Sequence, residues 1–215
     1  MPISRSALPV LSLGLFALLP AQQSSSVIVL TADITHAQET APNGELPLLT
    51  SGGAPRALSF GTATLTLNDA QTQLTMTATI FNIDVTGTQT PGDTNDNLVS
   101  AHIHAGLIGV NGGVVWGFFG TPANNNNPND GVVTPFAQGV GGTFTGTWDA
   151  PEGNNTTLAA QLNAILSGGT YLNFHTTQFG GGEIRGQIVP EPGVMALGTV
   201  IVAAGMTRRR RRARF

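Results

Sequence analysis

Three of the four histidines lie in segments that alternate like β-strands, and they are the side chains best suited to chemistry. His102 and His104 are two residues apart, so they share one face of a strand, whereas Ala101 and Ile103 share the other. His175 lies in a later alternating segment. If the two strands are neighbours, the imidazoles converge, and neutral imidazole is a favoured ligand of zinc and copper. The spacing therefore predicts a copper or zinc site at His102, His104 and His175, with a storage or redox role.

A structural role for the same histidines is the alternative. In that interpretation their rings hydrogen-bond the backbone or Asn173 and hold loops in place. The segment His102–Gly106 has a weak likeness to the copper-binding strand of copper/zinc superoxide dismutases. The bridging histidine, the disulfide cysteines and the later ligand segment of those enzymes are missing. The sequence leaves the metal site and the structural role both open.

Other catalytic patterns give little support to an enzyme. No serine lies in a nucleophile elbow, the chain has no cysteine, and no phosphate-binding glycine loop precedes a helix. Residues 93–97 begin like a calcium loop, but Leu98 replaces the required glycine and His104 stands in place of the closing glutamate. A plain turn is the better interpretation there. The sequence thus favours a binding or structural module over an enzyme, without deciding the question.

Glu183 and Arg185 form the one charged pair that strand spacing brings together near the end of the domain. Between the two terminal segments the only cations are Arg56 and Arg185, so a buried arginine needs a carboxylate partner. We therefore expect a structural ion pair between Glu183 and Arg185. Recognition of an anionic ligand by Arg185 is the alternative.

Short strands must position these residues. Threonine or another polar residue alternates with apolar residues, and Gly, Pro and Asn separate the runs. Leu158, Leu162 and Ile165 follow helical spacing before Gly168, which predicts one short helix. The pattern predicts an all-β sandwich or barrel with this helix at one end. The predicted strands are residues 60–67, 74–83, 98–104, 114–119, 142–148, 171–176 and 183–189.

The negative charge of the β domain argues against nucleic acid as a partner. Only 10% of the residues are charged, there is no lysine, and from Gln38 to Val189 two arginines face ten acidic residues, a net charge of −8. A surface this acidic repels phosphate backbones, so nucleic-acid binding is not expected.

The N-terminal segment resembles a signal peptide. Arg5 precedes an apolar run, residues 7–19, that is too short to span a membrane comfortably. Cleavage after Ala21 or after Ala37 would fit, so residues 1–37 are assigned to the leader. Residues 38–56, rich in Pro, Gly, Asn and Thr, are assigned to a linker, and the β domain to residues 57–189.

The C-terminal segment, residues 190–215, has three parts in a fixed order. Pro190, Glu191 and Pro192 precede an apolar stretch, residues 193–206, and an arginine cluster, Arg208, Arg209, Arg210, Arg211 and Arg212. The arginines resist translocation, so they would stay in the cytoplasm as a membrane stop. This order resembles the PEP-CTERM sorting signal, which implies cleavage by an exosortase-type membrane protease after transient anchoring in the inner membrane. A simple C-terminal membrane anchor is the alternative.

Two motifs of the β domain resemble the CHRD (chordin) domain family. They are the segment from Ala101 to Gly106, which contains His-Ile-His, and the closing Asn173-Phe174-His175-Thr176 followed by residues 182–186, Gly-Glu-Ile-Arg-Gly. The resemblance implies an immunoglobulin-like β-barrel. Bacterial members have no settled activity, and this chain lacks chordin's cysteine-rich modules, so growth-factor binding is not carried over. We expect an exported cell-surface or extracellular-matrix protein whose partners are the sorting protease and extracellular polysaccharide or surface proteins.

Overall fold

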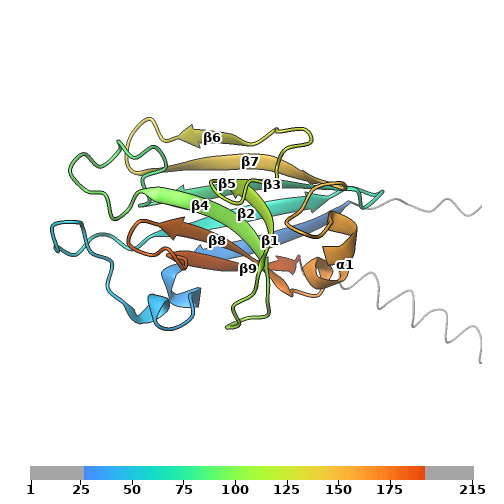
Figure 1. The fold of residues 1–215 in the computed structure, drawn as a ribbon, viewed down its shortest axis with the longest axis horizontal. Helices are drawn as coiled ribbons and strands as arrows, with labels where there is room; N and C mark the ends of the chain where they lie inside the picture. Colours follow the sequence, from blue (N-terminus) through green and yellow to red (C-terminus); the bar gives the residue numbers. More distant parts are fainter. Residues whose placement is uncertain (1–26, 192–215) are drawn as a thin grey trace, which may run out of the picture.

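The computed structural model describes residues 27–191, and its described part is an antiparallel β-sheet with one short α-helix (Figure 1). Of the predicted leader, residues 1–37, the first 26 residues lie outside the described residues. So do Pro192, the apolar stretch and the arginine cluster, Arg208–Arg212. The strands are β1 Ile28–Thr35, β2 Phe60–Leu67, β3 Gln73–Phe81, β4 Leu98–Ala105, β5 Val114–Phe119, β6 Val132–Pro135, β7 Gly141–Asp149, β8 Thr170–Thr176 and β9 Ile184–Pro190.

Alternation of polar and apolar residues explains why these segments are strands. In β2 every second residue from Gly61 to Leu67 is buried, and the residues between them, mostly threonines, are exposed or half-buried. β3 repeats the pattern and pairs with β2 across a turn, where Asn68 N–H donates to the Gln73 carbonyl at 3.0 Å. Threonine is branched at Cβ and suits the exposed side of a pleated sheet.

The nine strands form one continuous sheet in the order β5-β4-β8-β9-β1-β2-β3-β7-β6. The sheet curls so that its two halves face each other across an aromatic core. Trp116 of β5 stacks on Trp148 of β7 with centroids 5.8 Å apart, and Phe144 of β7 meets Phe174 of β8 at 5.4 Å. The all-β prediction is therefore confirmed, and the two facing layers are halves of a single curled sheet.

The predicted N-terminal boundary of the domain at residue 57 is wrong. β1 lies inside the sheet and pairs with β2 on one side and β9 on the other. Leu30 and Ile34 of β1 are fully buried in the core. The segment assigned to a linker also packs on the domain, through the short 3-10 helices η1 His36–Gln38 and η2 Asn43–Glu45 and through buried Leu48.

The single α-helix of the described residues, α1 Leu158–Leu166, occupies the predicted position at one end of the sheet (Figure 1). The side chain of Thr157 accepts a hydrogen bond from the N–H of Ala160 at 3.3 Å and so caps the first turn. Leu158 and Ile165 are fully buried, which fastens the helix to the core. Within residues 27–191, no helix combines the length and apolar character needed to cross a membrane.

Candidate metal centre

Strands β4 and β8 bring the three predicted histidines together. The strands are antiparallel neighbours, with His102 opposite Asn173 and His104 opposite Tyr171. His175 lies two residues beyond Asn173 and therefore points to the same side of the sheet as His102. Ala101 and Ile103, on the other side, are buried in the core. The predicted sharing of faces is what places the histidines together.

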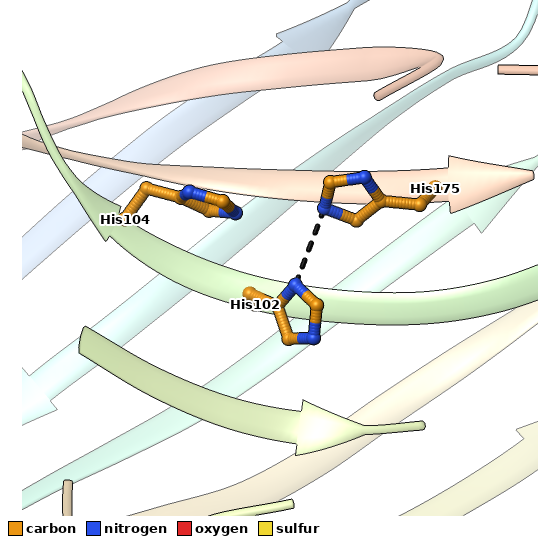
Figure 2. A group of neighbouring side chains, drawn as sticks. All are labelled: His102, His104 and His175. Atoms are coloured by element: carbon orange, nitrogen blue, oxygen red, sulfur yellow. Dashed lines mark hydrogen bonds between the residues drawn. The ribbon is translucent and has the colours of Figure 1, made fainter. Parts of the chain in front are cut away.

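The three rings point toward one another (Figure 2). One nitrogen from each ring can be chosen so that all lie within 4.8 Å of one another. Nδ1 of His102 and Nε2 of His175 are 3.2 Å apart. Two nitrogens bound tetrahedrally to one zinc ion, at about 2.0–2.1 Å each, lie about 3.3 Å apart. His102 and His175 are thus already spaced like two ligands of one ion.

The second nitrogen of each ring faces a backbone carbonyl of a covering loop. A carbonyl oxygen only accepts hydrogen bonds, so in each contact the ring nitrogen carries the proton. Donation of this kind fixes the tautomer and orientation of metal-binding histidines. The contacts are His102 Nε2 to Thr121 O at 3.1 Å, His104 Nδ1 to Gly112 O at 3.0 Å, and His175 Nδ1 to Gly180 O at 3.1 Å.

These contacts leave the inner nitrogens without protons when the rings are neutral. A hydrogen bond between His102 Nδ1 and His175 Nε2 would need an extra proton, which makes one ring a cation. The inner Nε2 of His104 is buried and has no hydrogen-bond partner. Three lone pairs therefore face a common point, and this is the arrangement that a metal ion satisfies.

Burial keeps the rings neutral. Exposed fractions are 4% for His102, 8% for His104 and 7% for His175, because loops cover this side of the sheet. Burial, followed by repulsion from the other two rings, lowers the pKa of His102 to about 4. Burial, followed by repulsion from His104, lowers the pKa of His175 to about 4. Burial also lowers the pKa of His104, and the charge of Arg185 adds to this effect. Near pH 7 all three can act as neutral ligands.

The structural role considered above is also partly present, because the outer nitrogens hold three loops. Gly112 shows how closely one loop lies on the sheet, since a Cβ at this position would overlap the carbonyl oxygen of Ala105. No described hydrogen bond joins the histidines to Asn173, whose Oδ1 has no partner. The loops therefore orient the rings, and the inner nitrogens stay available.

The predicted ion pair between Glu183 and Arg185 is wrong. Arg185 lies over the ring of Tyr171, with 3.4 Å from its guanidinium carbon to the ring centroid, and Tyr171 in turn stacks on His104 at 5.0 Å. The guanidinium also donates to the carbonyls of Leu107 and Val110 at 2.8 and 2.9 Å. Arg185 therefore contacts the histidine site through Tyr171, and its hydrogen bonds to Leu107 and Val110 hold the loop that covers the site.

Glu183 pairs instead with Arg56. The carboxylate accepts from the Arg56 guanidinium and the Ser59 hydroxyl, and from the Thr176 hydroxyl at 2.6 Å. His36 Nδ1 contacts the Glu183 carbonyl at 2.6 Å. The true partner, Arg56, comes from the segment that was assigned to a linker, which is why strand spacing alone selected the wrong arginine.

Glu39 is a buried acid that the sequence did not single out. It is 8% exposed, its Oε1 has no hydrogen-bond partner, and an ideal Cβ on Gly182 would lie 2.6 Å from that oxygen. Burial raises the pKa of Glu39 to about 7, although the charge of Arg185 acts in the opposite direction. Tyr171 lies on the same face of β8 as His175, but neither its stacking on His104 nor the place of Glu39 has a sequence signal, because both depend on loop packing.

Comparison with known proteins places the fold in a family. The model of the CHRD domain matches residues 30–188. No curated protein and no solved structure matches the chain. The matched range begins within β1 and ends within β9, so it includes all or most of every strand. It also contains the three histidines, Tyr171 and Arg185. The chain belongs to the CHRD domain family.

Proposed function

We propose that this CHRD-domain protein binds one zinc or copper ion through His102, His104 and His175. The observation that carries the proposal is the convergence of three ring nitrogens within 4.8 Å, while the other nitrogen of each ring contacts a loop carbonyl. An arrangement built only to hold loops would not require the inner nitrogens to meet.

The chemical type of the ligand atoms restricts which metal ion can bind here. The group contains three imidazoles and neither a carboxylate nor a thiolate. Imidazole suits zinc and copper, whereas calcium and magnesium prefer oxygen ligands. Three protein ligands leave a coordination position for water or a further ligand. With zinc the domain would serve in binding or storage, and only copper would add the redox role considered from the sequence.

Metal binding is tested on the full-length chain. We expect elemental analysis of protein from metal-replete medium to give about one equivalent of zinc or copper. His102→Ala/His104→Ala should weaken binding at least 100-fold, because one imidazole cannot hold the ion alone. Lowered pKa values for His102 and His175, about 4, mean that protons compete only in acid, so affinity should change little between pH 7.5 and 6.

His36→Asn is the matched control, since His36 is the fourth histidine and lies outside the cluster. This variant should keep full affinity per folded molecule. Metal-free wild-type protein after growth with metal, or equal affinity in the double variant, would contradict the proposal.

We also propose that the domain is exported and sorted by the C-terminal signal, to the cell surface or the extracellular matrix. Support comes from the charged-then-apolar leader and from the order of Pro190-Glu191-Pro192, apolar stretch and arginine cluster. Residues 190–215 fused to a secreted reporter should direct it to the surface when an exosortase-type protease is present. Unchanged delivery after deletion of Pro190–Pro192 would overturn this sorting proposal.

A further inference from the structure

The outer side of β2, β3 and β7 carries a two-dimensional array of threonines. Each of these strands has three threonines at alternate positions. Pairing places them in register, so that Thr64 of β2 lies opposite Thr77 of β3, which lies opposite Thr145 of β7. Thr31 of β1 extends this middle row. We call these three in-register rows the threonine array.

The nine threonines of the array are exposed or half-buried and uncharged, whereas the domain as a whole is acidic. Thr64, Thr77 and Thr145 are exposed, and the array itself holds no charged side chain. Residues 27–191 contain twelve acidic residues and two arginines. Three acids border the rows: Asp33 of β1 lies opposite Thr62, Asp130 accepts from the N–H of Thr147 at 2.9 Å, and Asp149 lies two residues beyond Thr147 on β7. An anionic polymer would be repelled by this domain, and the array offers no acid to a cationic one. Charge therefore fits an uncharged partner.

Threonine side chains repeat from strand to strand along each row, and in the two outer rows the hydroxyls of β3 and β7 lie close together. Cross-strand hydroxyls of Thr75 and Thr147 are 3.5 Å apart, and those of Thr79 and Thr143 are 3.4 Å apart. Neighbouring strands lie about 4.8 Å apart, which is close to the length of one sugar ring in an extended chain. Each hydroxyl can donate and accept, as the hydroxyls of a sugar can, and each threonine methyl can pack on ring C–H groups.

Aromatic side chains border the array at one end. Phe60 of β2 and Phe81 of β3 are paired across the strands, two residues beyond Thr62 and Thr79 and so on the same face, and their rings stack at 4.8 Å. Phe60 is 46% exposed and Phe81 is 37% exposed. Exposed aromatic rings beside hydroxyl groups are suited to a ligand that has both apolar C–H surfaces and hydroxyls.

We propose that the threonine array binds an uncharged polysaccharide chain lying across the strands, with Phe60 and Phe81 packing against its C–H surfaces. This site is separate from the histidine cluster. An ice crystal is a poorer fit, because β-strands twist relative to one another and the array belongs to a curled sheet. A flexible sugar chain can follow that twist, whereas a crystal plane cannot.

Affinity electrophoresis of the full-length chain tests the proposal, with gels containing dextran, laminarin, hydroxyethylcellulose or the anionic polymer alginate. We expect retardation by at least one of the three uncharged glucans and none by alginate. Thr64→Val/Thr77→Val/Thr145→Val removes three hydroxyls while keeping branched side chains, and it should weaken binding at least tenfold. The matched Thr64→Ser/Thr77→Ser/Thr145→Ser variant keeps the hydroxyls and should retain most of the binding.

Melting temperatures of both triple variants show that each is folded, and a chelator added to the gel should leave retardation unchanged. Several results would overturn the proposal: no retardation of wild-type protein by any uncharged glucan, equal retardation of the valine variant, or retardation by alginate alone. Inhibition of ice growth or self-association that the valine substitutions abolish, without glucan binding, would also overturn it and assign the array to a different partner.

Discussion

A chain that begins at Gln38 is expected not to fold, whereas a chain that begins at Gln22 is expected to fold. The shorter chain lacks β1, which lies in the middle of the sheet between β9 and β2. Burial of Leu30 and of Ile34 each stabilises the folded state by about 1.5–3 kcal/mol, and the shorter chain loses both contributions. Separation of β9 from β2 adds to this, and the total approaches the net stability of a typical domain, about 5–15 kcal/mol.

Circular dichroism and thermal melting of the two purified chains give the comparison. The chain from Gln22 should show a cooperative transition, and the chain from Gln38 should show none or be recovered only in aggregates. A cooperative β-sheet transition in the shorter chain would mean that β1 is dispensable and that the original boundary at residue 57 is closer to the truth. The outcome also selects between the two cleavage positions, since cleavage after Ala37 would remove β1.

Glu183→Ala is expected to lower the free energy of unfolding by about 3–5 kcal/mol, because it leaves Arg56 as a buried charge without its partner. The pair is enclosed, with side-chain exposures of 8% for Arg56 and 0% for Glu183. Hydroxyl groups of Ser59 and Thr176 lose the same acceptor. In a domain of this size the melting temperature should fall by about 10 °C or more.

Urea denaturation measures this effect, and Glu45→Gln serves as the control because Glu45 is exposed on η2. The control should change stability by less than about 0.5 kcal/mol. The double variant Arg56→Met/Glu183→Leu should be more stable than Glu183→Ala, since no unpaired charge stays buried. If Glu183→Ala behaves like the control, the pair does not hold the N-terminal segment to the sheet.

Much of the fold was predictable because side chains on strands alternate with a period of two. β2, Phe60–Leu67, and β5, Val114–Phe119, were predicted to the residue from their alternation. β1 was missed although Leu30, Ala32 and Ile34 alternate too. Its apolar residues follow an apolar leader, so they were assigned to export. β6, Val132–Pro135, is a short strand at the edge of the sheet, and its pattern is too brief to detect.

The histidine cluster was predictable for the same reason, and its surroundings were not. The alternation of polar and apolar residues in two predicted strands is enough to single out His102, His104 and His175. The pairing of β4 with β8 then brings these faces together. Burial of the cluster depends on loops, and the path of a loop leaves no periodic pattern in the sequence. The same limitation hid the contacts of Arg185 with the carbonyls of Leu107 and Val110, and it led to the incorrect pairing with Glu183.

X-ray absorption spectroscopy of full-length protein loaded with one equivalent of zinc is the most direct measurement of the proposed centre. The account predicts three imidazole nitrogens at about 2.0–2.1 Å from the ion, with the imidazole signal reduced in His102→Ala/His104→Ala. A spectrum fitted by oxygen ligands alone, or one that is identical in the double variant, would contradict a metal centre at His102, His104 and His175.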